Sequence, residues 1–276
     1  MKTATFKDKA TSEAGRLIVC VLASGSKGNV IYISNGRSAV LVDAGLSGKE
    51  IERRMAAAHL SPDHLDALIV SHEHSDHIRG VGVMARRYGL PIYMSAETAR
   101  AAAPQLGTIN DLRHFETGSR FWIDQLSIHP FATSHDAADP TGFTIGYNGC
   151  KIGIATDLGI ATAMVKHHLK QCVLVVLEAN HDADMLAKGP YPWYLKQRIK
   201  SRDGHLSNED SKDLLAEIRH QGLRHVILAH LSEINNTPEK AFQTVRPALD
   251  NGHGNVQLHV AYQDRCTQVF TLDGIA

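Results

Sequence analysis

Cysteine is scarce in this sequence: there are four in 276 residues, and no two of them have the close spacing of a zinc ribbon or a thioredoxin-type motif. Three lie in or beside apolar runs, where cysteine packs as a small hydrophobic residue. The four are Cys20, Cys150, Cys172 and Cys266. Isolated cysteines without a disulfide framework predict a reducing, cytoplasmic location.

Long hydrophobic runs are also missing. No apolar stretch approaches the roughly 20 residues that a membrane-spanning helix needs, so we expect no membrane partner. Residues 1–15 are polar and lack the apolar segment typical of a signal peptide. This segment predicts a flexible N-terminal arm.

Net charge is absent as well, because 29 Lys and Arg residues balance 29 Asp and Glu residues. No global basic field can attract nucleic acid, so a polyanion would have to bind at a local patch. With 43% hydrophobic and 21% charged residues, the composition is that of an ordinary folded protein. The length of the remaining chain predicts a single domain over residues 16–276.

Short apolar runs alternate with amphipathic stretches along the chain. The predicted strands include Leu17–Ala23, Val30–Ser34, Ala39–Asp43, Asp66–Val70, Pro91–Met94, Ile152–Thr156, Cys172–Leu177, Val226–His230, Val256–Ala261 and Thr267–Leu272. The predicted helices include Lys49–His59, Val81–Tyr88, Pro192–Arg202, Asn208–His220 and Glu239–Leu249. Strands in both halves with helices between them favour an α/β (α+β) fold of two packed sheets with helices outside.

Histidine is abundant: the chain has 17, more than its seven Phe and seven Tyr together. The densest stretch is Ser71–His77, which reads Ser-His-Glu-His-Ser-Asp-His directly after a predicted buried strand. Imidazole and carboxylate ligands together suit Zn²⁺, Mn²⁺ or iron. If the stretch begins extended, His72 and His74 share one side, and a following turn brings Asp76 and His77 to a second point. One short loop can thus begin two adjacent metal sites.

The same stretch resembles the His-x-His-x-Asp-His signature of the metallo-β-lactamase-fold hydrolases. Residues of the required types also follow later strands, where this family has its further ligands: His135, Asp157 and His230. Asp43 ends an earlier strand. The resemblance implies an αββα sandwich, with two mixed β-sheets flanked by helices.

The resemblance also implies a role for each of these positions. One metal would take His72, His74 and His135, and the other would take Asp76, His77 and His230, with Asp157 bridging the two. Two divalent cations, Zn²⁺ or Mn²⁺, could hold a hydroxide between them as the nucleophile. Asp76 is therefore predicted to be catalytic as well as a ligand, and Asp43 to orient a ligand histidine from behind.

Two further histidines are candidates for catalysis. Ser207 precedes a predicted helix, where free N–H groups could bind a phosphate, and His205 beside it could protonate a leaving oxygen. A plain helix cap, Ser207-x-x-Asp210, is the alternative. His205 and His230 resemble the C-terminal pair of RNase Z enzymes, which implies that His205 assists phosphodiester cleavage. His181 either contacts substrate or is structural.

A Gly/Ser-rich loop after the first strand adds candidate phosphate contacts. Ser26, Lys27 and Asn29 could bind an anion there, although such loops are more often ordinary turns. Basic residues cluster in two runs that flank the site motifs: Lys196, Arg198, Lys200 and Arg202, and Arg79, Arg86 and Arg87. Their position favours a polyanionic substrate.

Several segments resemble one bacterial subfamily, the YycJ/WalJ-like proteins. They are Ala23–Asn29, Ser71–His77, Glu178–Asp182, Gly189–Ile199, Gly204–Asn208 and His230–Asn236. This resemblance implies a 5′ to 3′ exonuclease acting on duplex or single-stranded DNA ends. Spacing alone supports a metal-dependent hydrolase, with phosphodiesters favoured. Two alternatives stay open: a small-molecule hydrolase, such as a glyoxalase II-like thioesterase or a cyclic-nucleotide phosphodiesterase, and a non-catalytic metal-binding regulator. A homodimer is compatible with the sequence.

Overall fold

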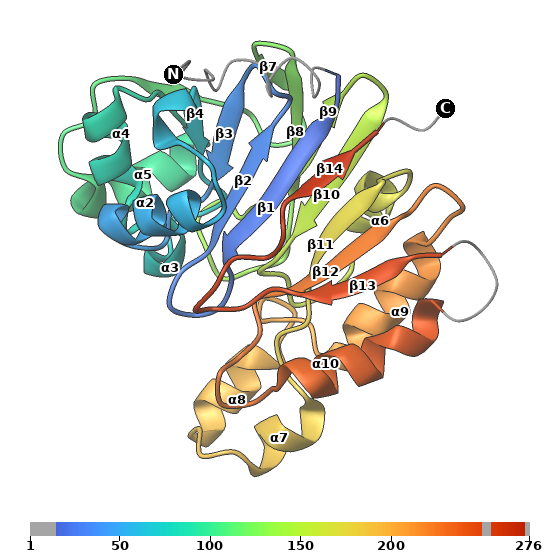
Figure 1. Cartoon of the computed structure of the whole chain (residues 1–276). Coiled ribbons are helices and arrows are strands. Elements are labelled where there is room, and N and C mark those ends of the chain that lie inside the picture. The colour runs from blue at the N-terminus through green and yellow to red at the C-terminus, as the bar shows by residue number, and fades with distance from the viewer. Residues whose placement is uncertain (1–14, 250–254, 274–276) are drawn as a thin grey trace.

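The computed structural model describes residues 15–249 and 255–273 (Figure 1). Apart from Gly15, the arm predicted at the N-terminus lies outside the described residues. Two seven-stranded sheets face each other, and helices cover their outer faces. This arrangement confirms the predicted fold. Within the described ranges, no helix is both long enough and apolar enough to cross a membrane.

The first sheet has the strand order β14-β1-β2-β3-β4-β5-β6. Its strands are β1 (Leu17–Ala23), β2 (Val30–Ser34), β3 (Ala39–Val42), β4 (Ala67–Ile69), β5 (Ile92–Met94), β6 (Leu112–His114) and β14 (Phe270–Leu272). Pairing is antiparallel from β14 to β3 and parallel from β3 to β6. The sheet is therefore mixed.

The second sheet has the order β13-β12-β11-β10-β9-β8-β7 and is also mixed. Its strands are β7 (Phe121–Ile123), β8 (Leu126–Ala132), β9 (Thr141–Tyr147), β10 (Cys150–Ala155), β11 (Leu174–Glu178), β12 (His225–Ala229) and β13 (Gln257–Val260). Pairing is antiparallel from β7 to β10 and parallel from β10 to β13.

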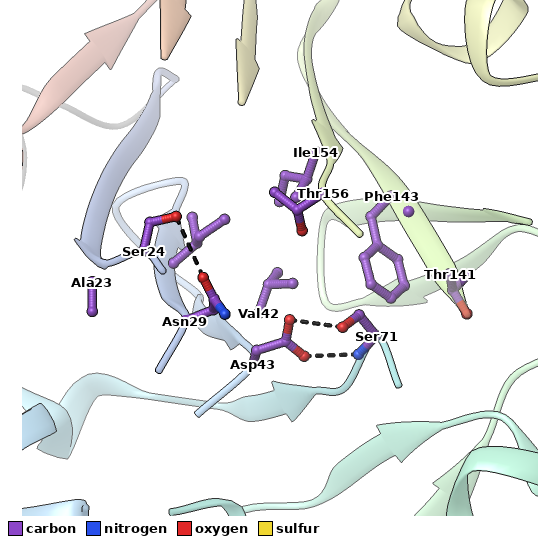
Figure 2. Close-up of a pocket in the computed structure, with 12 residues that line it drawn as sticks. Ala23, Ser24, Asn29, Val42, Asp43, Ser71, Thr141, Phe143, Ile154 and Thr156 are labelled. Carbon is purple, nitrogen blue, oxygen red and sulfur yellow. Dashed lines mark hydrogen bonds between the residues drawn. The ribbon is translucent and has the colours of Figure 1, made fainter. Parts of the chain in front are cut away.

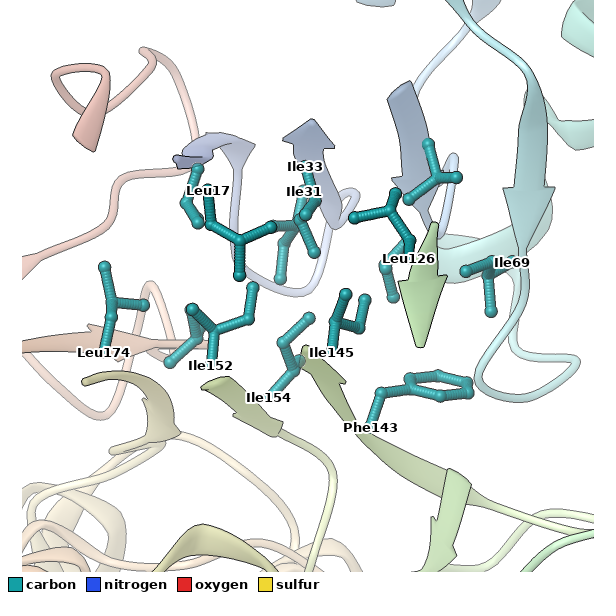
Figure 3. Packing of buried hydrophobic residues seen from close by; sticks show 14 of the residues in the cluster. Leu17, Ile31, Ile33, Ile69, Leu126, Phe143, Ile145, Ile152, Ile154 and Leu174 are labelled. Carbon is teal, nitrogen blue, oxygen red and sulfur yellow. The ribbon is translucent and has the colours of Figure 1, made fainter. Parts of the chain in front are cut away.

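The main core lies between the two sheets (Figure 3). Side chains of a strand point alternately to its two faces, so a strand covered on both sides is apolar throughout. In β1, Leu17, Val19 and Val21 pack into this core. Ile18 and Cys20, between them in the sequence, pack instead against the helices outside. This explains why β1 is a continuous apolar run rather than an alternating one.

The helices form two outer layers and one projection (Figure 1). The first layer contains α2 (Gly48–Ala57), α3 (Ser75–Ile78), α4 (Val81–Tyr88) and α5 (Ala96–Leu106). The second contains α6 (Ala163–Leu169), α9 (Asn208–Ile218) and α10 (Pro238–Val245). Two short helices, α7 (Ala183–Lys188) and α8 (Trp193–Ile199), project beyond the sheets. Single 3₁₀ turns occur at Pro62–His64 and Arg246–Leu249.

Most predicted elements agree with the structure to within three residues at each end. Helix α5 was not predicted: its alanines give a weak apolar stripe, and Pro104 lies inside it, where proline is unfavourable. Strand β3 pairs in parallel with β4, β10 with β11, and β11 with β12. This pairing brings the carboxyl ends of these strands to one edge of the sandwich. The loops after these ends carry the predicted metal ligands.

Candidate metal centre

The ligand loop after β4 has the two-part shape that the sequence predicts. His74 is the extended N-cap residue of α3, so the chain is extended up to that point and helical after it. Asp76 and His77 lie in the helix, and the His77 ring lies 4.1 Å from that of His72, measured between ring centroids. His72 and His77 are almost fully buried, at 1% and 0% exposure. The loop therefore presents four side chains to the interior from one short segment.

Three other strand ends complete the site. His135 follows β8, Asp157 follows β10 and His230 follows β12. Asp157 and His230, like Asp43 after β3, have a positive φ of 56–59°. Residues other than glycine rarely adopt this left-handed conformation, and it persists only where surrounding contacts impose it. At each of these strand ends the backbone turns so that a polar side chain enters the site.

The structure brings the seven predicted ligands together in overlapping groups. Within each group, one donor atom from every residue lies within 4.8 Å of the others. The groups are His72 with His74 and His135, Asp76 with His77 and His230, His72 with His77 and Asp157, and Asp157 with Glu178, His205 and His230. The first two are the predicted ligand triads, and the other two place Asp157 beside both.

Two features indicate that these residues fit cations. Nδ1 of His74 lies 3.1 Å from Nε2 of His72 and 3.3 Å from Nε2 of His135, so ring nitrogens converge on one point. Oδ2 of Asp157 is buried and accepts no hydrogen bond, and Nε2 of His77 lies 3.3 Å from it. A buried carboxylate oxygen without a hydrogen bond is costly, and a metal ion at this point would satisfy it. The donor set and its burial fit a binuclear metal site.

The outward-facing ring nitrogens of the histidines are held by other groups. Nδ1 of His72 lies 3.0 Å from the Ser71 hydroxyl, and Nδ1 of His135 lies 3.0 Å from the carbonyl oxygen of Gly204. Nδ1 of His77 donates to Asp43 at 2.8 Å. Such contacts fix the ring orientation and leave the second nitrogen free for a metal. The orienting role predicted for Asp43 agrees with this geometry.

Glu178 is a site residue that the sequence did not identify. It is fully buried at the end of β11 and accepts hydrogen bonds from Nδ1 of His205 at 2.8 Å and Nδ1 of His230 at 2.9 Å. It also accepts backbone N–H groups of Asp157 and Leu158. One signal was available: Glu178 is a carboxylate that continues an apolar strand. A buried charge at such a position needs several partners, and here it has them.

The electrostatics of the site reflect its excess of buried carboxylates. Burial alone would lower the pKa of His230, but Asp157 and Asp76 contribute to raising it well above its ordinary value. The same opposition holds for His77, whose pKa is also raised, again chiefly by Asp157. Burial lowers the pKa of His72 well below its ordinary value, with His77 adding to the effect. Without metal, protons on two histidines thus balance negative charge that cations would otherwise neutralise.

The metal centre opens into a cavity of about 230 Å³. Its wall includes ligands from both triads and a second group of residues: Ser26, Asn180, Tyr191, Leu195, Arg198, Ile199 and His205. The His205 ring lies 4.9 Å from that of His135 and 5.2 Å from that of His230, measured between ring centroids. This cavity is where a substrate can reach the predicted ligands.

A second, much smaller cavity of about 10 Å³ lies beneath the ligand loop, between the sheets (Figure 2). It has room for roughly one water molecule. Figure 2 shows Asp43 accepting hydrogen bonds from the backbone N–H and the hydroxyl of Ser71 along its lower edge. Its size excludes a substrate, so it belongs to the support of the loop.

The Gly/Ser-rich loop contributes more to the metal centre than to the cavity. Ser26 lines the cavity, whereas the exposed Lys27 pairs with Glu233 at 2.6 Å. Asn29 is buried, and its Nδ2 donates to Oδ2 of Asp76 at 3.2 Å. The phosphate contact predicted for Asn29 therefore has no support from the geometry, because its amide is used to position a predicted ligand.

The capping box predicted at Ser207 is confirmed, and it leaves little for a phosphate. The Ser207 hydroxyl accepts from the backbone N–H of Asp210 and donates to the Asp210 carboxylate. The backbone N–H of Asn208 donates to the carbonyl oxygen of His181. These groups are already satisfied, so the geometry does not support a phosphate contact at Ser207.

The catalytic role predicted for His181 also finds no support. Its side chain is 3% exposed and is not part of the described cavity wall. Burial lowers its pKa to about 4, so the ring is neutral at ordinary pH. Its backbone forms an isolated bridge to Ser207. This position fits the structural alternative, in which His181 fixes the start of α9.

Comparisons with known proteins agree with this site. A family profile described as "Beta-lactamase superfamily domain" matches residues 38–231. The chain is 40% identical to the exodeoxyribonuclease YycJ of Bacillus anthracis over 83% of this chain and 88% of that protein. It is 38% identical to the exodeoxyribonuclease WalJ of Streptococcus pneumoniae over 82% of this chain and 85% of that protein.

The fold also matches solved structures. The metallo-β-lactamase fold protein YhfI from Bacillus subtilis superposes with a TM-score of 0.72 at 18% identity, covering 93% of this chain and 99% of that one. The fold, the paired ligand triads and the sequence matches agree with one another. The chain belongs to the metallo-β-lactamase-fold superfamily and, within it, to the family of YycJ and WalJ.

Proposed function

We propose that this protein is a two-metal phosphodiesterase that degrades DNA as an exonuclease, in the 5′ to 3′ direction. One observation carries the proposal: two triads of metal-binding side chains meet at the buried Asp157, and members of both triads line an open cavity. The names of the relatives, both exodeoxyribonucleases, supply the substrate class. The direction of degradation rests on the subfamily resemblance.

The ligands divide between the metals as the family resemblance implies. His72, His74 and His135 would hold one cation, Asp76, His77 and His230 the other, and Asp157 both. Bound Zn²⁺ or Mn²⁺ would polarise the phosphate and lower the pKa of water at the site. The native metal stays a prediction, because imidazole and carboxylate ligands accept either ion.

In this proposal His205 acts as the general acid. Its Nδ1 is held by Glu178 at 2.8 Å, so the other ring nitrogen, Nε2, is directed toward the cavity that His205 lines. When both nitrogens carry protons, Nε2 can give its proton to the oxygen that leaves phosphorus. Glu178 fixes the orientation of the ring, because its buried carboxylate accepts the hydrogen bond from Nδ1.

Support for a polyanionic substrate comes from charge near the cavity. Arg198 lies on the cavity wall, and the segment from Pro190 to Arg202 contains four cations and no acidic residue. Phosphate contacts from such a segment supply affinity that does not depend on base sequence. A DNA substrate would also agree with the cytoplasmic location predicted from cysteine usage, and the homodimer stays a prediction.

The test uses protein loaded separately with Zn²⁺ and Mn²⁺ and given linear DNA, duplex or single-stranded, labelled at the 5′ or the 3′ end. We expect stepwise release of mononucleotides from the 5′ end. Asp157→Asn is the matched negative control: asparagine tolerates the left-handed backbone of Asp157, so the variant should fold while losing the bridging charge.

Small substrates test the alternative that the protein is a small-molecule hydrolase. A chromogenic phosphodiester, a cyclic nucleotide and a glutathione thioester are offered to the same preparations. Hydrolysis of the thioester or of a cyclic nucleotide without cleavage of any DNA would overturn the exonuclease proposal in favour of a small-molecule hydrolase. Binding of two metals without hydrolysis of any substrate would favour a regulator.

A further inference from the structure

Helix α8 is only partly covered by the rest of the protein, although it carries large apolar residues. None of its residues is buried. Trp193 and Tyr194 are 75% and 74% exposed, the highest values among the exposed large hydrophobic residues in the described part of the chain. Figure 1 shows α7 and α8 projecting below the sandwich. Two adjacent aromatic rings in water are unfavourable, which indicates that this surface binds something.

The helix is continuous with the wall of the reaction cavity. Tyr191 precedes it and lines the cavity, as do Leu195, Arg198 and Ile199 on the helix itself. Residues four apart in a helix lie on the same face, so Tyr194 extends the wall outward from Arg198 by one turn. Tyr191 and Tyr194 therefore lie along the route between bulk solvent and the metal centre, and Trp193 is next to Tyr194 at the start of the helix.

Contacts fix α8 in this place relative to the predicted ligands. Arg198 pairs with Asp136, the residue directly after His135. Lys196 donates to the carbonyl oxygen of Ala187 at 2.7 Å, which ties α8 to α7. The backbone N–H of His205 donates to the carbonyl oxygen of Ile199 at 2.9 Å. The helix is thus anchored at the cavity and presents its aromatic end outward.

The charge of this segment indicates which kind of molecule binds the surface of α8. Three aromatic residues precede four cations in the segment from Pro190 to Arg202, which contains no acidic residue of its own. Such a segment suits a flexible polyanion whose bases are unstacked, because the rings can stack on bases while the cations contact phosphates. We propose that α8 is a stacking platform for the unpaired bases of a single DNA strand, and that it guides the strand's end into the cavity. This inference rests on the proposed function and adds how the substrate is held.

The first experiment compares binding of ordinary single-stranded oligonucleotides with oligonucleotides of the same length containing abasic positions. The protein is metal-loaded and carries Asp157→Asn to prevent degradation. Adding Trp193→Ala and Tyr194→Ala should weaken binding of ordinary DNA about tenfold or more, since stacking contributes strongly per base. Abasic DNA should bind equally weakly with or without these two changes. Phenylalanine at both positions should restore binding of ordinary DNA.

Trp122 provides a matched control. It is 60% exposed on β7, at the end of the sandwich away from α8 (Figure 1), and Trp122→Ala should leave binding unchanged. The chain has two tryptophans, so Trp122→Phe leaves Trp193 as the single fluorescent indole. Single-stranded DNA should quench its emission, and abasic DNA should not.

The outcomes separate this inference from the proposed function. If the protein degrades DNA and the alanine changes at Trp193 and Tyr194 alter neither DNA binding nor KM, the stacking platform is contradicted and the exonuclease proposal is retained. If DNA quenches the fluorescence of Trp193 but is never hydrolysed, the exonuclease proposal is contradicted and the stacking platform is retained. If Trp193→Ala converts a dimer into a monomer by light scattering without affecting DNA binding, α8 is a protein interface and the platform is overturned.

Discussion

The carboxylate of Glu178 accepts a hydrogen bond from Nδ1 of His205 at 2.8 Å. Glu178 is fully buried, whereas the His205 side chain is one-fifth exposed and lines the reaction cavity. The pair therefore connects the buried support of the metal centre to the surface that a substrate touches. A histidine oriented in this way can donate from its free nitrogen without turning.

Replacing His205 with asparagine should separate acid catalysis from metal binding. We expect kcat for DNA to fall by about 10²–10⁴, the usual contribution of a positioned acid. Hydrolysis of a bis(p-nitrophenyl) phosphate should fall much less, because p-nitrophenolate leaves without needing a proton. Metal content measured by atomic emission should stay at two ions per chain. An equal loss on both substrates would assign His205 a structural role.

Glu178→Gln should impair both of the histidines that this carboxylate orients. The change keeps the volume but removes the charge that holds Nδ1–H of His205 and of His230. Supporting residues of this kind typically account for about 10–100-fold in metal affinity or activity. Metal titration and kcat/KM measurements test this expectation. Glu209→Gln, at an exposed residue of α9, is the control. An equally large loss of metal affinity or activity in this control would contradict the role of Glu178.

Gly45 is required where its loop passes behind the ligand loop. A Cβ atom added there would lie 1.6 Å from the carbonyl oxygen of Asp76, which is backbone and cannot move aside easily. Gly45→Ala should therefore displace Asp76, destabilise the fold by about 1–3 kcal/mol and weaken metal binding. Thermal unfolding and metal titration are the measurements. Gly146→Ala is the control, because its nearest contact would be 3.6 Å, and it should be tolerated.

The fold and the set of converging side chains could be predicted from sequence because both depend on local patterns. Apolar runs marked the strands, and His135, Asp157 and His230 each lie within three residues of a strand end. Parallel pairing then brings strand ends together, so ligands distant in sequence meet at one edge. These relations require no knowledge of side-chain packing.

The predicted roles that find no support in the geometry are those that depend on packing. Asn29 lies in a loop whose composition is typical of phosphate binding, yet its side-chain amide donates a hydrogen bond inward to Asp76. Ser207 offers a helix N-terminus, but its capping box and the carbonyl of His181 use the groups that a phosphate would need. Glu178 was missed because its partners come from separate loops. Composition cannot indicate which way such a side chain points.

His168 should give the protein an acid-sensitive contribution to stability away from the metal centre. Burial lowers its pKa to about 4 from the ordinary 6.5, and the nearby His129 and His167 add to this. Its ring stacks on Phe131 at 4.7 Å. The unfolded chain therefore binds a proton at higher pH than the folded one. Stability from this group is complete above pH 6.5 and is lost as the pH falls toward 4.

The expected loss is at most about 3 kcal/mol, since one pKa unit corresponds to about 1.4 kcal/mol. His168→Phe keeps the stacking and removes the titration, so its unfolding free energy should depend less on pH between 6.5 and 4 than that of the unchanged protein. Urea unfolding at a series of pH values measures this difference. His64→Gln, at an exposed histidine that is not among the groups acting on His168, should keep the original slope. Identical slopes in all three proteins would contradict the assignment.

Metal removal should lower stability because the centre gathers buried negative charge. In the absence of cations, burial opposes the charged form of Asp157, and protons held on His230 and His77 balance it only in part. A ligand present at 100 to 1,000 times its Kd stabilises a fold by about 2.7–4.1 kcal/mol. For a chain of this size, that corresponds to a fall in Tm of about 5–15 °C on chelation.

Differential scanning fluorimetry with and without a chelator measures the shift, and added Zn²⁺ or Mn²⁺ should reverse it. Asp157→Asn should show a smaller shift, because the bridging charge that responds to both metals is gone. Trp193→Ala, which changes only the surface of α8, should show the full shift. If chelation removes both metals and leaves Tm unchanged, other groups of the protein must balance the buried negative charge. That result would contradict the expectation that two cations stabilise this site.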